Sequence, residues 1–309
     1  MIPKVSIIIV NWNTRDLVDQ SIASIIRFEK TAPFEIIVVD NASVDGSIAH
    51  LEAKYPHVRV IANSVNLGFA KANNQGAAAA LARHLLLFNS DAYLTEEILP
   101  ACLERMQALG NCILACRILN PDGSLQFSVD SFPSLGGYLG EVFGSIGGIL
   151  QKKILLQSRV QGTRRMDWAT GAFLMVETET YRKLGGLNEG IFMYGEDMEF
   201  CHRAAAAGIP CHYFTGVSVV HIGGGSANYD TVRSLILTDL GRLQTFASLK
   251  GRGPALALRG ILILRSLLRG SLYLAASLLP KRRNLGIKAR HHFTGILVLV
   301  GLINAKRFI

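Results

Sequence analysis

Residues 5–13 carry the sequence VSIIIVNWN, in which six mostly β-branched residues, Val5–Val10, lead into the polar residue Asn11. A near-continuous apolar run of this length predicts a strand that is covered on both faces, as strands of parallel sheets are. The run is too short to be the apolar core of a signal peptide. We therefore expect a buried first strand and a protein body that stays in the cytoplasm.

Similar runs recur along the first 116 residues and alternate with helical patterns. The expected strands are Val5–Val10, Glu35–Val39, Val58–Ala62, Leu85–Phe88 and Ile113–Ala115, with helices at about 16–28, 46–54, 68–82 and 96–108. Alternation of this kind predicts βαβ units, and hence an α/β fold with a mostly parallel central sheet and helices on both faces. Further along we expect a strand at Asp167–Val176, a helix at Glu196–Ala207 and a strand at Val217–His221.

The order changes after residue 116. Asn120-Pro121-Asp122-Gly123 predicts a turn within a hairpin over 117–130. Next comes an apolar stretch with glycines at 136, 140, 144 and 148. It fits a closely packed helix or a mobile loop over the site, and the sequence leaves both open.

Composition limits the class of protein. The chain has 309 residues, of which 50% are apolar and 18% charged, enough for one large α/β domain with or without an appendage. Its five cysteines form no CxxC pair, which favours reduced, buried thiols. The net charge of +9 is uneven: residues 251–309 hold eleven Lys or Arg and no Asp or Glu, and the remainder totals 21 − 23 = −2. Only the tail is therefore expected to have a general affinity for polyanions.

The basic tail is also apolar. Pro254–Leu279 is rich in Leu, Ile and Ala and is interrupted by Arg259, Arg265 and Arg269, which fall within about one third of a helix circumference. We expect a helix that lies on an anionic membrane with these arginines toward the phosphates, while a membrane span and a soluble dimerisation element remain alternatives. Lys281-Arg282-Arg283 and a second apolar run, Phe293–Ile303, extend the pattern.

Polar residues follow three of the expected strands. Asn11 to Asn13 follow the first, Asp40 and Asn41 the second, and Asn89-Ser90-Asp91 the fourth. Ligands of open α/β sheets bind beyond the carboxyl ends of the strands, so these positions predict a nucleotide site. Asp91, projected from a buried strand, fits a ligand of Mg²⁺ or Mn²⁺ or a simple turn residue.

Two later segments carry titratable groups. Glu196-Asp197-Met198-Glu199 opens a helix, where carboxylates interact favourably with the helix dipole or divide catalytic work between a base and a positioning group. Arg203, four residues after Glu199, is expected to pair with it. His221 ends a strand just before Gly223-Gly224-Gly225, which fits a metal ligand beside a phosphate-binding loop or a structural histidine.

In this order, the segments resemble the inverting family 2 glycosyltransferases with the GT-A fold, and especially their rhamnosyltransferase-like branch. The matching segments are 5–13 (VSIIIVNWN), 38–43 (VVDNAS), 66–70 (NLGFA), 89–91 (NSD), 168–172 (WATGA), 195–200 (GEDMEF) and His221. The resemblance covers about residues 5–225. Any one segment is weakly specific, but seven in family order are strong support.

The resemblance implies a role for each matching position. The nucleotide would be held by Val10, Asn11, Asn13, Asp40, Asn66, Gly68, Lys71, Asn89 and Ser90. Asp91 and His221 would bind Mg²⁺ or Mn²⁺, and Asp197 would be the catalytic base with Glu196 beside it. Acceptor binding or positioning would fall to Trp168, Thr170, Gly171, Glu199 and Arg203. Asn89 replaces the first Asp of the family's DxD element, which leaves one fewer negative charge at the ion.

These expectations give a GT-A domain over 1–250, with a nucleotide-binding half (1–116) and an acceptor and catalytic half (117–250), followed by a membrane-associating helical tail (251–309). The expected reaction transfers a sugar with inversion from a nucleotide diphosphate to a glycan or lipid-linked glycan, in cell-surface polysaccharide synthesis at the inner face of the cell membrane. L-rhamnose from dTDP-rhamnose is the leading donor, and a UDP-hexose or galactofuranose donor is the alternative.

Three other classes of protein fit the sequence less well. A nucleic-acid binder is disfavoured because the tail has no interleaved aromatic residues. A nucleotidyltransferase would need a glycine-rich, basic loop after the first strand, which the sequence lacks there. A non-catalytic nucleotide-sugar-binding protein is disfavoured by the joint presence of Asp91, Asp197 and His221.

Overall fold

The computed structural model of the protein describes residues 2–144, 146–223, 232–279 and 285–305. Gly224, Gly225 and Lys281-Arg282-Arg283 lie outside the described residues. The chain forms two compact units, of which the first comprises Met1–Phe132, Gln151–Glu189 and Glu196–Ser226. The second comprises Pro133–Leu150, Gly190–Gly195 and Ala227–Ile309. The functional division expected at residue 250 stays a prediction.

The first 90 residues form the regular α/β part of the first unit. Its elements are β1 (Val5–Asn11), α1 (Arg15–Phe28), β2 (Phe34–Asp40), α2 (Ser47–Lys54), β3 (Arg59–Ala62), α3 (Phe69–Ala79) and β4 (His84–Asn89). The strands are parallel in the order β3-β2-β1-β4, with Asn11 of β1 opposite Asp40 of β2. The polar residues predicted at the strand ends therefore share one edge of the sheet.

The later elements extend this sheet on the far side of β4. They are β5 (Ala92–Tyr93), α4 (Leu99–Leu109), β6 (Ile113–Leu119), β7 (Val129–Asp130), β8 (Thr163–Met166), β9 (Trp168–Ala169), β10 (Phe173–Glu177), α7 (Thr178–Lys183), α8 (Glu196–Ala206) and β11 (Cys211–His221). Within the described residues nine strands form one sheet, in which β10 lies antiparallel between β4 and β6, and β6 pairs with β11 in parallel. The α/β fold class is confirmed, with antiparallel strands in its second half.

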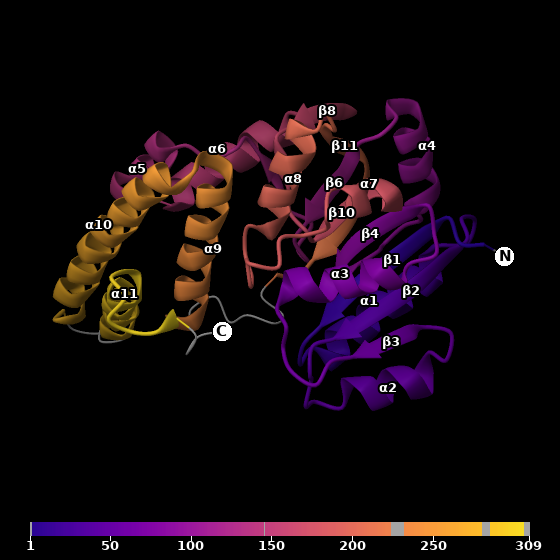
Figure 1. The fold of residues 1–309 in the computed structure, drawn as a ribbon, viewed down its shortest axis with the longest axis horizontal. Coiled ribbons are helices and arrows are strands. Elements are labelled where there is room, and N and C mark those ends of the chain that lie inside the picture. The colour runs from indigo at the N-terminus through magenta and orange to yellow at the C-terminus, as the bar shows by residue number, and fades with distance from the viewer. Residues whose placement is uncertain (1, 145, 224–231, 280–284, 306–309) are drawn as a thin grey trace. The chain divides into compact units, whose positions relative to one another are not determined.

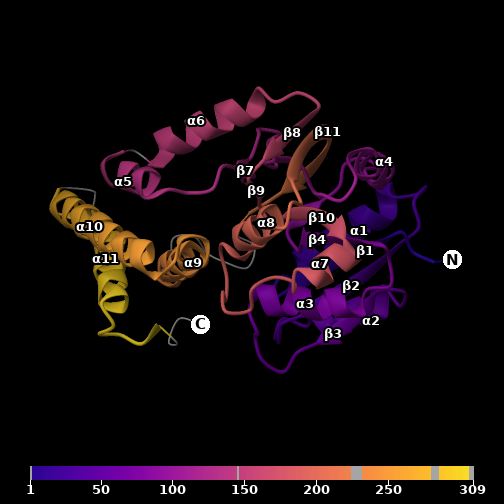
Figure 2. The ribbon, with the colours of Figure 1, turned by 45° about the horizontal axis from the view of Figure 1, so that its top comes forward.

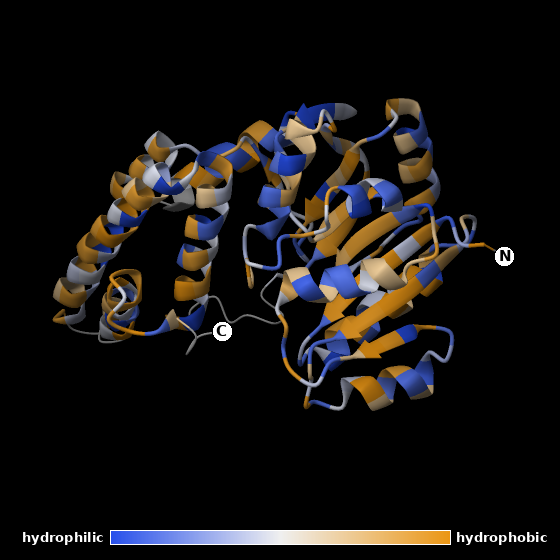
Figure 3. Cartoon of the chain, in the orientation of Figure 1, coloured by the Kyte–Doolittle hydropathy of each residue, from blue (hydrophilic) through white to orange (hydrophobic). Residues whose placement is uncertain are grey.

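Helices cover both faces of this sheet (Figures 1 and 2). One face packs against α1, α2 and α4 through residues such as Ile22, Leu51 and Cys102. The other packs against α3, α7 and α8 through residues such as Ala77 and Phe200. The central strands are coloured as mostly hydrophobic in Figure 3, as expected for strands buried on both faces. The predicted buried thiols are confirmed, since all five cysteines are free and buried.

Several segments depart from the expected pattern. The strand expected at 167–176 is divided into β9 and β10, because Thr170 donates its backbone N–H to Ser128 and the chain turns at Gly171. The hairpin expected over 117–130 forms next to its turn, where Gly123 N donates to Asn120 O at 2.9 Å and Leu119 bridges Leu125, whereas β7 pairs with β9. The glycine-rich stretch forms the helix α5 (Leu135–Phe143), so the helical alternative holds there.

The second unit is helical. Besides α5 and the Gly190–Gly195 segment, it holds α9 (Val232–Lys250), α10 (Arg252–Ser277) and α11 (Leu285–Leu299), while α6 (Ile146–Ser158) crosses the boundary between the units. Its apolar core contains Tyr138, Leu243, Phe246, Leu258, Leu262 and Leu299. A C-terminal helical region is thus confirmed.

Two of the three predicted arginines of α10, Arg265 and Arg269, do not face outward as predicted. Arg265 is 4% exposed, and its Nη2 lies 2.6 and 2.7 Å from the two carboxylate oxygens of Asp239 in α9. Arg269 donates to the carbonyl of Glu141 in α5, and of the three arginines only Arg259 is exposed. The prediction was wrong because acidic and carbonyl partners inside the helical unit stabilise this polar face.

The leucines of α10 lie on the outer face instead. Leu256, Leu267 and Leu274 are 67%, 45% and 50% exposed, and at about 100° per residue they fall on one side of the helix. Neighbouring leucines at 264, 268, 272 and 278 are also exposed. Among the described residues no helix is long and apolar enough to cross a membrane.

Candidate active site

The loops after β1 and β2 are fastened to each other at the carboxyl edge of the sheet. Asn11 Nδ2 donates to Asp40 Oδ2 at 2.8 Å and to Ser43 Oγ at 3.1 Å, and Ser43 N donates to Asp40 Oδ1 at 2.8 Å. Asn11 and Asp40 are fully buried, whereas Asn13 is exposed and has a positive φ of 52°. Asn11 and Asp40 therefore order these two loops, on which Asn13 is exposed.

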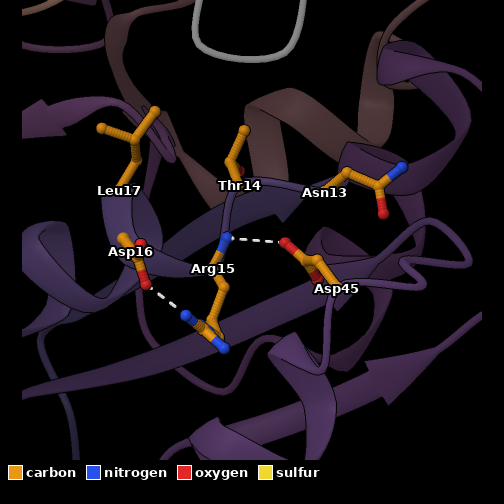
Figure 4. A pocket seen from close by; sticks show the side chains of 6 residues that line it. All are labelled: Asn13, Thr14, Arg15, Asp16, Leu17 and Asp45. Atoms are coloured by element: carbon orange, nitrogen blue, oxygen red, sulfur yellow. Dashed lines mark hydrogen bonds and ion pairs between the residues drawn. The ribbon is translucent and has the colours of Figure 1, made fainter.

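A pocket of about 290 Å³ opens beside these loops (Figure 4). It is lined by Asn13, Thr14, Arg15, Asp16, Leu17 and Asp45. Asp45 Oδ2 accepts the backbone N–H of Arg15 at 2.9 Å at the start of α1, and Oδ1 accepts that of Ser47 at 3.1 Å at the start of α2. Neither Asp91 nor Asp197 lines this pocket, so the carboxylate chemistry belongs elsewhere on the edge.

The loop between β3 and α3 approaches the same edge. Asn66 Oδ1 accepts the N–H of Gly68 at 2.9 Å, and Asn41 Nδ2 donates to Gly68 O at 3.1 Å. Gly68 has a φ of 84°, which favours glycine, and the exposed Lys71 lies in the first turn of α3. This helix start offers backbone N–H groups and a cation, both of which suit a phosphate.

Asp91 and His221 meet at the end of β4 and β11. Both side chains are largely buried, and His221 Nε2 lies 3.1 Å from Asp91 Oδ1. The backbone also joins the two segments, since Ile222 N donates to Asp91 O at 3.0 Å. Beside them, Ser90 Oγ lies 3.1 Å from the hydroxyl of Thr14. The segment predicted as a DxD-like element is thus brought together with His221, 130 residues later in the chain.

Gln126 fixes the imidazole of His221. Its Nε2 donates to Asn120 Oδ1 at 2.7 Å and to the carbonyl of His221 at 3.0 Å, which leaves Oε1 to accept from His221 Nδ1 at 2.6 Å. Nδ1 therefore carries hydrogen, and a neutral His221 presents the lone pair of Nε2. Sequence reasoning missed Gln126, because nothing in the residues after the Asn120–Gly123 turn indicates a partner 95 residues away.

The environment of Nε2 fits a cation. Two acceptors 3.1 Å apart, Nε2 and Asp91 Oδ1, repel each other unless a proton or a metal ion lies with them. Asn89 Nδ2 lies 3.1 Å from the same nitrogen, and Asn89 Oδ1 is a buried oxygen without a hydrogen-bond partner in the described part of the chain. A histidine nitrogen whose other ring nitrogen is held, together with a carboxylate, is a usual arrangement of metal ligands.

Within the described ranges, no group of three or more His, Cys, Asp or Glu side chains could hold a metal ion. Asp91 and His221 together offer two protein ligands. Ions such as Mg²⁺ and Mn²⁺ keep several waters and accept substrate phosphate oxygens at the remaining positions. The donor set therefore fits an ion that is held jointly with a diphosphate.

Asp197 lies in the first turn of α8 and is held by backbone donors. Gly171 N donates to Oδ2 at 2.9 Å, and Met198 N donates to Oδ1 at 2.7 Å. Burial raises the pKa of the Asp197 carboxyl, and these hydrogen bonds offset part of that effect. An ionised carboxylate with a raised pKa is a stronger base than an ordinary Asp, which suits proton abstraction.

Asp197 and Asp91 lie at the same edge of the sheet. Gly171, the donor to Asp197, precedes Ala172, whose carbonyl accepts the N–H of Asn89 at 3.3 Å. Only Ser90 separates Asn89 from Asp91. A Cβ at Gly171 would lie 3.2 Å from the Phe69 ring and 3.9 Å from Asp197 Cβ, so the start of α3 meets the same point. The residues expected to hold the nucleotide and the metal, and the expected base, are therefore linked through a short series of contacts at this edge.

The remaining predicted residues flank Asp197. Glu199 is 2% exposed and forms the predicted ion pair with Arg203, at 2.8 Å between Nη2 and Oε2. Arg203 also donates to the carbonyls of Leu184 and Gly186, so it ties α8 to the preceding loop. Glu196, 5% exposed, opens the helix. Glu199 and Arg203 therefore hold α8 against the preceding loop.

Trp168, predicted as an acceptor residue, forms an aromatic pair with Phe127. The ring centroids of Trp168 and Phe127 are 6.1 Å apart in a T-shaped arrangement, and Trp168 Nε1 donates to Ser131 O at 3.1 Å. Both rings are half-buried. Thr170, two residues beyond Trp168, is likewise half-buried. Phe127 was not predicted from the sequence, because Phe127 and Trp168 come into contact only when β7 pairs with β9.

Comparison with protein families shows which family the chain belongs to. The family model described as Glycosyl transferase family 2 matches residues 6–166, more than half of the chain. The chain belongs to glycosyl transferase family 2. The matched range contains the Asn11, Asp40 and Asp91 strand ends, and α8 with Asp197 follows it.

Relatives place this family 2 glycosyltransferase in the rhamnosyltransferase-like branch. Over 225 residues it is 28% identical to the low-salt glycan biosynthesis hexosyltransferase Agl10 of Haloferax volcanii, covering 72% of this chain and 68% of that protein. Over 225 residues it is 27% identical to the N-acetylglucosaminyl-diphospho-decaprenol L-rhamnosyltransferase of Mycobacterium tuberculosis, covering 66% of this chain and 71% of that protein.

Among solved structures, the mannosyltransferase PcManGT from Pyrobaculum calidifontis, in complex with GDP-Man and Mn²⁺, matches this family 2 glycosyltransferase with a TM-score of 0.53. The match covers 97% of this chain and 87% of that chain at 13% identity. At this identity the likeness concerns the fold alone, and it confirms the predicted GT-A fold.

Proposed function

We propose that this glycosyltransferase moves a sugar, with inversion, from a nucleotide diphosphate to a hydroxyl group of a lipid-linked glycan. The observation that carries the proposal is the convergence of Asp91, His221 and Asp197 at one edge of the sheet, through the Gly171–Ala172 link to Asn89. Asp91 and His221 suit the cation that accompanies the diphosphate, and Asp197 is suited to accept a proton.

Asp91 and His221 would hold Mg²⁺ or Mn²⁺, with Gln126 keeping Nε2 of His221 available. When bound, the ion would act as a Lewis acid that offsets the charge of the departing diphosphate. Asn89 Oδ1 supplies a further buried acceptor beside this pair. The exposed Asn13 and Lys71, with the N–H groups at the start of α3, would orient the nucleotide.

Asp197 would act on the acceptor. Its carboxylate takes the proton from the acceptor hydroxyl as that oxygen bonds to the anomeric carbon, while the bond to the diphosphate oxygen breaks and its electron pair leaves with the diphosphate. Gly171 N–H and Met198 N–H hold the carboxylate oriented for this transfer. A positioned base contributes about 10²- to 10⁴-fold in rate. A single displacement inverts the anomeric configuration.

L-rhamnose from dTDP-rhamnose is the leading donor, supported by the rhamnosyltransferase relative. A UDP-hexose is the alternative, supported by the hexosyltransferase relative, and galactofuranose remains the third sugar to test. The relative's named acceptor, a lipid-linked diphosphate sugar, also supports a membrane location for this chain.

The second unit supports attachment to an anionic membrane. Residues 251–309 carry eleven basic and no acidic residues, and α10 presents exposed leucines. Apolar side chains that enter the lipid boundary beside basic residues are the features of interfacial helices. We propose that the leucine face of α10, and not its arginine face, meets the cytoplasmic leaflet.

The experiment is a panel of nucleotide sugars assayed for transfer and for binding, with and without Mn²⁺, on the wild-type protein and on Asp197→Asn. We expect the variant to bind the donor normally and to lose transfer by at least about 10²-fold. Normal turnover of the Asp197→Asn protein would refute the assignment of the base.

A further inference from the structure

The segment Gly190–Gly195 leads directly into the helix that carries Asp197. Its last two residues have left-handed backbone conformations, with φ of 71° at Tyr194 and 103° at Gly195. A bulky residue such as tyrosine rarely adopts this conformation, and it persists only where surrounding contacts hold it. Glu196 and Asp197 follow without a linker. The direction in which α8 begins therefore depends on whatever holds this segment.

Helix α9 supplies side-chain contacts to both ends of the segment. Gln244 Nε2 donates to the carbonyl of Gly190 at 2.9 Å, and the hydroxyl of Thr245 donates to the carbonyl of Gly195 at 3.0 Å. Thr245 is 2% exposed. A Cβ at Gly195 would lie 2.3 Å from the Thr245 hydroxyl, so this position requires glycine for space as well as for φ.

Gly241 makes the contact at the middle. A Cβ on Gly241 would lie 2.1 Å from the carbonyl oxygen of Tyr194 and 2.8 Å from that of Met193, both of them backbone atoms. Positions 241, 244 and 245 share one helix face, because side chains three and four residues apart are neighbours. The absence of a side chain at Gly241 therefore lets the strained segment lie directly on α9.

We infer that Gly241 and Thr245 of α9 are positioning residues for the reaction, which set the backbone of Tyr194 and Gly195 and thereby the placement of Asp197. The inference rests on the proposed role of Asp197 as base. A base acts only within hydrogen-bond reach of its proton, and a misplacement of 1 Å can cost about 10²-fold in rate. The C-terminal helices thus serve the chemical step in addition to any role at a membrane.

The two residues act on the same two peptide groups in different ways. Gly241 allows the close approach of the Tyr194 carbonyl, and Thr245 holds the next carbonyl, that of Gly195, by a hydrogen bond. Asp197 itself is held from another side by Gly171 N–H at 2.9 Å. A shift of the Tyr194–Gly195 backbone would strain the hydrogen bond from Gly171 N–H to Asp197. This hydrogen bond favours the ionised carboxylate. The acidic limb of the rate profile should then move to higher pH.

The test uses the full-length Gly241→Ala protein with Gly260→Ala as matched control. A Cβ at Gly241 must move from 2.1 Å to at least about 3 Å from the Tyr194 carbonyl, a shift of about 1 Å. We expect kcat to fall about 10²-fold, with dTDP and UDP binding in the presence of Mn²⁺ unchanged. In Gly260→Ala, whose Cβ meets no atom of the described residues within 4 Å, kcat should stay within about twofold.

A second pair of variants guards against misfolding of Gly241→Ala. Thr245→Val keeps the shape but loses the hydrogen bond to Gly195, and should lower kcat about tenfold while the protein stays folded, with a melting temperature only a few degrees lower. Thr245→Ser should restore kcat and return the acidic limb of its pH profile to the wild-type position. If Asp197→Asn is inactive while Gly241→Ala and Thr245→Val keep wild-type kcat, the inference is overturned and the proposed function stands. An active Asp197→Asn overturns the proposed function itself.

Discussion

Replacing Gln126 with leucine tests whether His221 is a metal ligand held in one tautomer. The change removes three hydrogen bonds of the amide, including the acceptor 2.6 Å from His221 Nδ1. The imidazole could then rotate or carry its hydrogen on Nε2, and both changes withdraw the lone pair that faces Asp91. Loss of such a partner typically weakens metal binding about 10- to 100-fold. At about 1.4 kcal/mol per tenfold, this corresponds to roughly 1.4–2.8 kcal/mol.

The assay is sugar transfer measured against Mn²⁺ concentration, together with calorimetric titration of Mn²⁺ in the presence of the nucleoside diphosphate. The half-saturating Mn²⁺ concentration should rise about 10- to 100-fold in Gln126→Leu, while the rate at saturating Mn²⁺ stays close to wild type. Gln75→Leu is the control, because Gln75 exchanges two hydrogen bonds with Asn63 and does not contact His221. An unchanged Mn²⁺ dependence in Gln126→Leu would refute the assignment of His221.

Three further predictions concern the base, the outer face of the tail and its interior. Because Asp197 must be ionised to act and burial raises its pKa, activity should fall as pH drops through a value above 3.8, measured as the acidic limb of kcat. Leu267→Gln with Leu274→Gln should weaken co-sedimentation with vesicles containing phosphatidylglycerol at least about tenfold, since each buried leucine contributes about 1.5–3 kcal/mol. Asp239→Ala leaves the buried Arg265 unpaired and should lower the free energy of unfolding by about 3–5 kcal/mol in denaturant titrations.

Each of these predictions has a matched control. If Asp197→Glu keeps activity, its kcat should still fall at acidic pH. A kcat that does not depend on pH would contradict the role of the carboxylate. Leu81→Gln changes a leucine that is 72% exposed in the first unit, and should leave vesicle binding intact. Lys183→Ala removes an exposed ion pair with Glu179, with a cost below about 1 kcal/mol. If Asp239→Ala lowered the free energy of unfolding by no more than Lys183→Ala does, the buried pair would add nothing to stability beyond an exposed pair.

The regular part of the fold was predictable because its signals are local. The strand expected at Val5–Val10 is observed at Val5–Asn11, and that at Leu85–Phe88 is observed at His84–Asn89. Continuous β-branched runs that end in polar residues specify both a buried strand and its exposed end. The antiparallel position of β10 was not predictable, because the order of strands in a sheet depends on long-range packing that no short run encodes.

The candidate site was predictable only where a motif carried it. Asp91 and His221 were expected to meet, and they do, with 3.1 Å between Oδ1 and Nε2. Gln126 and the α9 contact of Gly241 were missed, because each acts on a partner many residues away through an amide or an absent side chain. Such contacts leave no periodic pattern, so the chain must fold before they can be recognised.

The tail shows where pattern reasoning gives a definite but incorrect answer. The spacing of Arg259, Arg265 and Arg269 correctly separates two faces of α10, but the pattern alone does not say which face is buried. Asp239, 26 residues before Arg265, decides the matter, because a paired charge can be buried whereas an unpaired one cannot. With the arginines directed inward, the leucines are left at the surface. Helix α10 thus binds Asp239 of α9 on one face and offers an apolar face outward. A lipid contact on α10 would therefore act on α9, whose Gly241 supports the segment before Asp197.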